Sequence, residues 1–197
     1  MRRKGDPYTK LAKEYGLRSR AYFKLKDIDE RYGVIEDGDI VIDIGAAPGG
    51  WMKYSLKKVG FDGMVIGIDK RNIEEFDEPN AIIITIDIMS QEVFNVLKSI
   101  LDDRKANVII SDASPNISGI YEIDTERIFT LNKRTLEIAD RFLERGGKTV
   151  IKTFQGSHER RLENSMKKRF KVVKKYKPKI SRKHSSEIYY LGFLFRG

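Results

Sequence analysis

The sequence predicts a doubly wound α/β fold, in which helices cover both faces of a mostly parallel sheet. Strand-like and helix-like segments alternate along the 197 residues, and such alternation is typical of this fold class. The runs at 40–44, 81–86 and 107–111 are almost entirely apolar, as expected for parallel strands buried on both faces. A loop of small residues at 45–51 follows the first run directly.

Seven segments have the composition of strands and together predict a seven-stranded sheet. No convincing helix separates the last two, so we expect them to pair antiparallel and to end a mostly parallel sheet. The predicted strands cover residues 40–44, 64–69, 81–86, 107–112, 147–153, 170–176 and 188–195.

Helices are predicted at 20–32, 49–59, 90–102, 125–145 and 157–169. In the helix at 125–145, Thr125 suits the N-cap, and Gly146 and Gly147 follow the last turn. Its apolar residues recur at helical spacing, at Ile128, Leu131, Ile138 and Phe142.

Composition narrows the class of protein further. The chain has no Cys and only two His, so disulfides and thiolate or histidine metal centres are not expected. No apolar run approaches the roughly 20 residues that span a bilayer. The first residues lack the apolar stretch of a signal peptide. We therefore expect one cytoplasmic domain, without a bound metal and monomeric.

The net charge of +9 is unevenly distributed. Residues 1–26 carry +7 and residues 167–183 carry +10, which leaves −8 for the remainder. If the two basic segments meet on one face, they form a surface for a polyanion. The alternative is that both are simply solvated chain ends.

The loop that follows the first strand has the features of a ligand site. Asp43 lies near the end of the apolar run, and Gly45 begins the loop. A glycine there can adopt a positive φ and let the backbone approach a ligand. Pro48 suits the first turn of the next helix, whose unpaired N–H groups favour a carboxylate or phosphate. An ordinary tight turn is the alternative.

Two further acids end neighbouring strands and suggest the kind of ligand. Asp69 is placed to accept hydrogen bonds from a ribose diol. Asp87 suits the exocyclic amine of an adenine, or equally a turn or helix cap before Gln91. The loop lacks the G-x-G-x-x-G spacing of dinucleotide sites. An adenosine with a short charged tail fits this set better, and S-adenosylmethionine is such a molecule.

Two strand ends bring a lysine and a carboxylate toward the same edge of the sheet. Asp112 follows the strand at 107–112, and Lys152 lies near the end of 147–153. A lysine at the end of an apolar strand is costly unless it is paired or functional. The pair can therefore serve proton transfer from a hydroxyl, or it can be a structural ion pair.

Five ordered motifs resemble the FtsJ/RrmJ-type RNA 2′-O-ribose methyltransferases, the family of ribosomal RNA large subunit methyltransferase E. They lie at 18–25, 45–51, 111–119, 152–156 and 185–189. The resemblance implies a Rossmann-like S-adenosylmethionine-dependent methyltransferase fold and an RNA substrate. Residues 1–197 are then one methyltransferase domain, with segments 1–26 and 167–183 as RNA-binding elements. Residues 157–160 depart from the family's acidic-aromatic pattern.

The resemblance also implies the site residues. The family's Lys-Asp-Lys-Glu tetrad falls on Lys24, Asp112, Lys152 and Glu187. Lys152 is then the general base and Asp112 orients it, although Asp112 as base stays open. Lys24 stabilises the developing charge, and Glu187 has a positioning role. The implied cofactor-binding residues are Asp43, Gly45, Ala46, Ala47, Pro48, Gly49, Gly50, Trp51, Asp69, Asp87 and Asp112.

The expected reaction is 2′-O-methylation of a uridine ribose in 23S ribosomal RNA. Methylation of the tRNA anticodon loop is one alternative, and a non-catalytic RNA-binding ribosome assembly factor is another. An NAD(P)-dependent oxidoreductase is disfavoured by the glycine spacing and leaves the basic segments unexplained. Among the aromatic residues, Tyr8, Tyr22 and Tyr176 are candidates either for stacking on a base or for packing.

Overall fold

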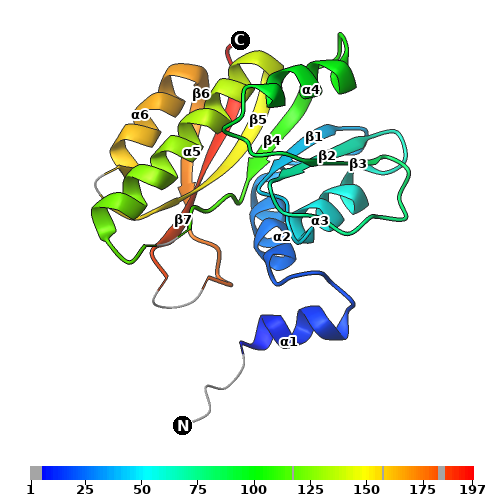
Figure 1. Cartoon of the computed structure of the whole chain (residues 1–197), viewed down its shortest axis with the longest axis horizontal. Coiled ribbons are helices and arrows are strands. Elements are labelled where there is room, and N and C mark those ends of the chain that lie inside the picture. Colours follow the sequence, from blue (N-terminus) through cyan, green and yellow to red (C-terminus); the bar gives the residue numbers. More distant parts are fainter. Residues whose placement is uncertain (1–5, 117, 157, 182–184) are drawn as a thin grey trace.

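The computed structural model describes residues 6–116, 118–156, 158–181 and 185–197. Its seven-stranded sheet has the order β3-β2-β1-β4-β5-β7-β6 (Figure 1). All neighbours pair in parallel except β7, which is antiparallel to both β5 and β6. The strands are β1 (Ile40–Ile44), β2 (Met64–Asp69), β3 (Ala81–Thr85), β4 (Ala106–Ser111), β5 (Leu143–Phe154), β6 (Phe170–Tyr176) and β7 (Glu187–Phe195). The predicted sheet is thus confirmed, and the final strand is inserted between β5 and β6.

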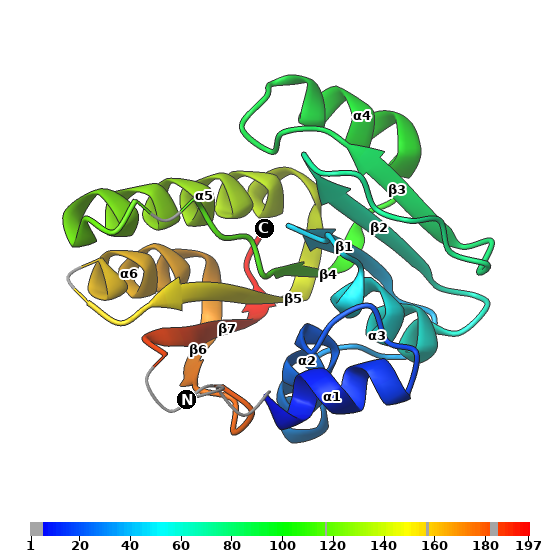
Figure 2. The same ribbon diagram turned by 60° about the horizontal axis from the view of Figure 1, so that its bottom comes forward.

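Helices cover both faces of the sheet, as predicted (Figure 2). They are α1 (Pro7–Glu14), α2 (Ala21–Tyr32), α3 (Gly50–Val59), α4 (Glu92–Leu101), α5 (Tyr121–Phe142) and α6 (Glu159–Arg169). One apolar core contains residues of α2 and α3, and the other contains residues of α4, α5 and α6.

Alternation along the strands supplies both cores. In β7, Ile188 and Tyr190 belong to the core under α4, α5 and α6, whereas Tyr189 and Leu191 belong to the core under α2 and α3. Successive side chains of a strand point to opposite faces. The period of two therefore decides which side chains can reach a site formed beside α2 and α3.

The predicted helix at 125–145 has the wrong boundaries. Helix α5 begins at Tyr121, with Ile120 as N-cap, and ends at Phe142. The hydroxyl of Thr125, predicted as the N-cap, instead donates to the carbonyls of Tyr121 and Glu122 inside the helix. Leu143 already begins β5, where it is buried and pairs with Ala106. Burial of this leucine in the sheet ends the helix before the glycines.

Helix α1 is not among the predicted elements. Asp6 caps it by accepting from the Tyr8 amide at 3.1 Å, and the following proline occupies its first turn. Only Ala12 is fully buried in this helix. A short helix with so small an apolar face has little hydrophobic periodicity to detect.

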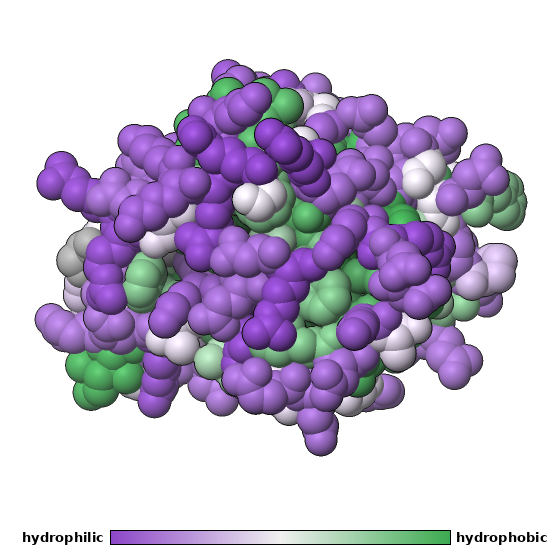
Figure 3. All heavy atoms as spheres, turned by 90° about the horizontal axis from the view of Figure 1, so that it is seen from above, coloured by the Kyte–Doolittle hydropathy of each residue, from purple (hydrophilic) through white to green (hydrophobic). Residues whose placement is uncertain are grey.

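The outer surface seen from above is mostly hydrophilic, with hydrophobic residues in scattered groups (Figure 3). Such groups are ordinary on a protein surface. No helix in the described part of the chain has both the length and the apolar character needed to cross a membrane.

Candidate active site

The glycine loop brings the end of β1 close to the loop after β4. Gly45 has φ +76°, and a Cβ added there would lie 2.5 Å from the Cα of Ala113. The amides of Gly45 and Ala46 donate to the Ile68 carbonyl at 2.8 and 3.2 Å, which joins the loop to β2. Helix α3 begins directly afterwards at Gly50. Gly45 thus allows a close approach between two loops at the strand ends, and the binding of a ligand by this loop stays a prediction.

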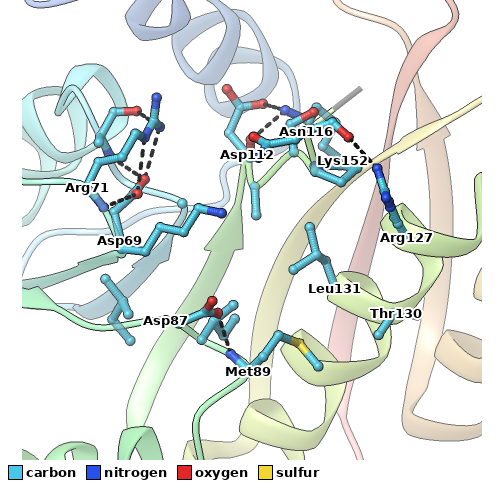
Figure 4. Close-up of a pocket in the computed structure, with 18 of the residues that line it drawn as sticks. Asp69, Arg71, Asp87, Met89, Asp112, Asn116, Arg127, Thr130, Leu131 and Lys152 are labelled. Atoms are coloured by element: carbon cyan, nitrogen blue, oxygen red, sulfur yellow. Dashed lines mark hydrogen bonds and ion pairs between the residues drawn. The ribbon is translucent and has the colours of Figure 1, made fainter. Parts of the chain in front are cut away.

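A cavity of about 1220 Å³ lies beyond the carboxyl ends of the central strands (Figure 4). The predicted site residues that line it are Gly45, Ala47, Asp69, Asp87, Asp112 and Lys152. The other predicted cofactor residues do not line the cavity. They lie in β1, in the glycine loop and in the first turn of α3, namely Asp43, Ala46, Pro48, Gly49, Gly50 and Trp51. A cavity at this edge is where α/β sheets bind ligands.

Asp69 is held as an acceptor by its neighbours. It accepts from the Ala47 amide at 3.0 Å, from the Arg71 amide at 2.9 Å and from the Arg71 guanidinium. Burial acts to raise the pKa of Asp69, but these hydrogen bonds and the Arg71 charge lower it below the usual value. The same guanidinium donates to the Ala47 carbonyl at 2.9 Å. Sequence reasoning overlooked Arg71, although it follows Asp69 by only two positions.

The structure shows the turn contact of Asp87, and its contact with an adenine amine stays a prediction. One carboxylate oxygen accepts from the Met89 amide at 2.9 Å, which is a turn contact. The residue is also exposed and lines the cavity. Gln91, the N-cap residue of α4, makes no side-chain cap bond.

Asp43 lies beneath the loop and is completely buried. Neither of its carboxyl oxygens has a hydrogen-bond partner of ordinary geometry within the described residues. Burial, together with the charges of Asp112 and Asp69, raises the pKa of Asp43 well above its usual value. The group therefore favours its protonated form more than an ordinary aspartic acid does.

Two lysine–carboxylate pairs lie close together at the other end of the cavity, where Asp112 and Lys152 line it and Lys24 and Glu187 do not. The Nζ of Lys152 lies 3.1 Å from Oδ1 of Asp112 and donates to the Asp112 carbonyl at 2.5 Å. The Nζ of Lys24 lies 2.5 Å from Oε1 of Glu187. Both lysine side chains are about one-tenth exposed or less. The structure thus brings together all four residues of the predicted tetrad.

Tyr189 joins the two pairs. Its hydroxyl lies 2.9 Å from Asp112 Oδ1 and 2.9 Å from Glu187 Oε1, and it accepts from Lys24 at 3.4 Å. The ring is fully buried, and its centroid lies 5.7 Å from that of Trp51. Sequence reasoning assigned no role to this tyrosine, although it ends the motif at 185–189.

The network fixes the charge of Asp112. Burial acts to raise its pKa, but the charges of Lys152 and Lys24 and the hydrogen bond from Tyr189 lower it below the usual value. Burial and the two nearby carboxylates raise the pKa of Tyr189 well above its usual value. Tyr189 therefore stays a hydroxyl donor, and Asp112 stays an anion that orients Lys152.

The two basic segments meet beside α2. The Arg20 guanidinium donates to the Ile180 carbonyl at 2.8 Å. Asp27 accepts from the Tyr176 hydroxyl at 2.8 Å and from the Lys179 amide at 3.1 Å. Residues 1–5 and 182–184 of these segments lie outside the described residues. The described parts of the two segments thus lie next to each other at Arg20 and Ile180, and a shared basic face for a polyanion stays a prediction.

The three predicted stacking tyrosines are packed against other rings. Tyr8 contacts Phe23 at 5.8 Å between centroids, Tyr22 contacts Tyr54 at 5.3 Å, and Tyr176 contacts Tyr32 at 5.3 Å. Of the two roles that the sequence left open for these tyrosines, the structure therefore shows packing.

A mostly parallel sheet with β7 inserted antiparallel, a glycine loop and acids at the strand ends defines a Rossmann-like methyltransferase fold. Solved structures support this class. Fibrillarin from Aeropyrum pernix, in complex with natively bound S-adenosyl-L-methionine, has a TM-score of 0.59 at 14% identity and covers 87% of this chain and 75% of its own.

Sequence comparison then gives the family. The model of the FtsJ-like methyltransferases matches residues 17–195, and the chain belongs to this family. The ribosomal RNA large subunit methyltransferase E of Methanobrevibacter smithii is 43% identical over 100% of this chain and 93% of its own length. The corresponding protein of Methanocaldococcus jannaschii is 42% identical over 100% of this chain and 81% of its own.

A solved relative agrees with the family assignment. The crystal structure of a putative ribosomal RNA methyltransferase from Plasmodium falciparum has a TM-score of 0.81 at 30% identity. It covers 91% of this chain and 99% of its own. The expected family and fold are thus confirmed.

Proposed function

We propose that this protein transfers a methyl group from S-adenosylmethionine to the 2′-hydroxyl of a ribose in RNA. The observation that carries the proposal is the buried network of Lys24, Glu187, Tyr189, Asp112 and Lys152 at one end of the cavity. A site that only binds RNA has no need of two desolvated lysines held by carboxylates, since burying charges is costly.

The residues at the other end fit S-adenosylmethionine. Gly45 lets the loop after β1 pack directly against Ala113, and both loops line the cavity. Asp69 suits the ribose diol after displacement of Arg71, and Asp87 suits the adenine amine. The amides at the start of α3 suit the carboxylate. When bound, this cofactor supplies an activated methyl group on a sulfonium.

The reaction requires the 2′-hydroxyl to lose its proton as its oxygen attacks the methyl carbon. We assign Lys152 as the acceptor of this proton, after its ammonium group has released a proton to solvent, with Asp112 orienting its Nζ. The positive charge of Lys24 stabilises the negative charge that develops on the attacking oxygen. Glu187 and Tyr189 hold Lys24 and Asp112 in place. Asp112 as the base is the variant of this mechanism, because a coupled pair shares its titration.

Ribosomal RNA is the proposed substrate, with a uridine of the large subunit as the target. The names of the Methanobrevibacter and Methanocaldococcus relatives support large-subunit RNA. We further propose that residues 1–197 act as one cytoplasmic, monomeric methyltransferase domain. Segments 1–26 and 167–183 would bind phosphates without reading sequence. The contacts of Arg20 with Ile180 and of Asp27 with Tyr176 support this arrangement, with the described parts of the two segments on one side of α2.

The test is methyl transfer from labelled S-adenosylmethionine to unmodified ribosomal subunits, free ribosomal RNA and tRNA in separate reactions. Digestion of the labelled RNA identifies the nucleoside. A 2′-O-methylated uridine from subunits or ribosomal RNA is the expected product. Label only in tRNA would move the target to the anticodon loop. No label, with cofactor still bound, would contradict the enzymatic assignment.

A further inference from the structure

A second cavity, of about 810 Å³, lies among α1, α2, α3 and the turn after α3. Figure 1 shows α1 below α2 and α3, and residues of all three helices line the cavity. We call this cavity the α1–α3 groove. Its side chains are mainly aromatic, aliphatic or basic, and the ones used below are Tyr15, Tyr22, Phe23, Lys26, Lys57 and Phe61.

Two aromatic rings of the groove are open to solvent. Tyr15 is 70% exposed and Phe61 is 93% exposed. Phe61 follows Gly60 in the turn between α3 and β2 and belongs to neither apolar core. A phenylalanine this exposed contributes nothing to hydrophobic stability. The two rings are therefore available to a ligand, unlike the packed rings of Tyr8 and Tyr22.

The charges around the groove favour an anion. Lys26, Lys53 and Lys57 line it, and Glu78 is the acid that lines it with them. Glu78 is paired with Lys53 at 2.6 Å, and Lys26 lies 3.6 Å from Glu30 in an exposed pair one helix turn apart. Lys57 has no ion pair among the described residues, so the three lysines outnumber these two acids. Exposed rings beside lysines are the arrangement by which proteins bind single-stranded nucleic acid, with stacking for the bases and cations for the phosphates.

Helix α2 connects the groove to the active site. Tyr22 and Phe23 line the groove, and the next residue, Lys24, pairs with Glu187 in the catalytic network. One turn of α2 thus carries two rings of the groove and the lysine that pairs with Glu187. An RNA strand that continues from Lys152 across this turn of α2 reaches the groove.

We propose that the α1–α3 groove binds a single-stranded stretch of the RNA substrate next to the target nucleotide. Bases stack on Tyr15 and Phe61, while Lys26 and Lys57 contact phosphates. The proposal rests on RNA being the substrate, as proposed above. The groove reads no base edges, because stacking accepts any base.

The test uses a fluorescein-labelled single-stranded RNA of about 20 nucleotides and mixed sequence, long enough for a groove and a site. Fluorescence anisotropy gives its dissociation constant for the wild type and for the double variant Tyr15→Ala/Phe61→Ala. We expect RNA affinity to fall about tenfold or more. Affinity for S-adenosylmethionine and the unfolding temperature should not change, because both side chains are exposed.

Three further variants make the test specific. Tyr15→Phe/Phe61→Trp keeps the rings and should restore affinity. Leu194→Ala removes an apolar side chain that is 50% exposed and lies outside the groove and outside both basic segments, and should leave RNA binding unchanged. Lys26→Ala/Lys57→Ala should make the dependence of log Kd on log salt shallower by about 0.7 for each phosphate that the variant no longer neutralises.

The outcomes separate this proposal from the proposed function. Unchanged RNA affinity in the Tyr15→Ala/Phe61→Ala variant would overturn the groove proposal, including the case in which the groove binds a peptide instead. The groove proposal would also be overturned if the Tyr15→Phe/Phe61→Trp variant bound RNA as weakly as the alanine variant. If the wild type binds RNA but transfers no methyl group, the methyltransferase assignment fails while the anisotropy series still decides the role of the groove.

Discussion

The two ends of the main cavity are built in different ways. At the Asp69 end, the donors are backbone amides and the acceptors are acids that end single strands, and Asp69, Arg71 and Ala47 contact one another within residues 47–71. At the Lys152 end, the side chains come from α2, β5, β7 and the loop after β4. The first end is assembled by local structure and the second by tertiary structure.

This difference determines how each end responds to substitution. Each contact at the Asp69 end is one of several parallel hydrogen bonds, so the loss of one weakens binding by a modest amount. At the Lys152 end, Tyr189 and the two ion pairs share partners. Removal of one member leaves another buried and unpaired, and effects in such networks are not additive.

The largest effect is expected for Lys152→Ala. Loss of the proton acceptor should lower single-turnover methyl transfer by a factor of about 10² to 10⁴. Cofactor affinity, measured by calorimetry, should stay close to that of the wild type. Lys148→Ala is the matched control, because Lys148 also lies in β5 but pairs with Glu36 outside the cavity. Retained turnover in Lys152→Ala would overturn the base assignment.

Tyr189→Phe tests whether the network acts as one unit. Removal of the hydroxyl should lower kcat about tenfold to hundredfold, as expected for a lost hydrogen bond to a charged group. KM for RNA should not change, because the ring still packs on Trp51. The hydroxyl helps to lower the pKa of Asp112, so the acidic limb of the pH–rate profile should move to higher pH.

The matched control for this variant is Tyr190→Phe. Tyr190 is the next residue of β7, is also buried, and its hydroxyl donates to Glu159 at 3.0 Å on the other face of the sheet. It should lose stability without a change in the pH–rate profile. Equal kinetic effects of the two variants would mean that Tyr189 has only a structural role.

A smaller effect is expected from substitutions at the Asp69 end. Asp69→Asn should raise the dissociation constant of S-adenosylmethionine about tenfold, with kcat nearly unchanged at saturating cofactor. Arg71→Ala should act in the opposite direction by a few-fold, because it frees the carboxylate of a competing donor. Weaker binding in Arg71→Ala, measured in the same titration, would show instead that Arg71 contacts the cofactor.

The smallest effect concerns stability and comes from Asp43. A raised pKa means that folded Asp43 retains its proton at pH values where the unfolded chain, with a pKa of about 3.9, has lost it. The stability that Asp43 contributes is therefore fully present below about pH 3.9. It is lost as the pH rises through the pKa of Asp43 in the folded state. Asp43→Asn removes this loss and should be more stable than the wild type at pH 8, with a smaller difference at pH 5.

Urea unfolding midpoints at the two pH values measure this effect. If Asp43→Asn is less stable than the wild type at pH 8, then a charged Asp43 makes stabilising contacts with the amides of the loop. Asp62→Asn, a substitution of an exposed aspartate, serves as the control for the change of charge alone.

Local patterns in the sequence were sufficient to predict the sheet, the ligand loop and the acids at the strand ends. These features depend on contacts between near neighbours in the chain. Apolar runs predict buried parallel strands, and glycine and proline mark the turn at 45–51. The motifs at 18–25 and 185–189 located Lys24 and Glu187 only through family resemblance, because no local pattern relates residues 163 positions apart.

Which side chains meet depends on the way distant segments pack. Insertion of β7 between β5 and β6 pairs Tyr189 directly with Lys152, and this strand order is not encoded in any local pattern. The same holds for the end of α5 at Phe142, where burial of Leu143 in the sheet outweighs the helical periodicity. It holds also for the groove between α1 and α3. Propensity and periodicity act over a few residues, whereas burial and pairing are settled by contacts between distant segments.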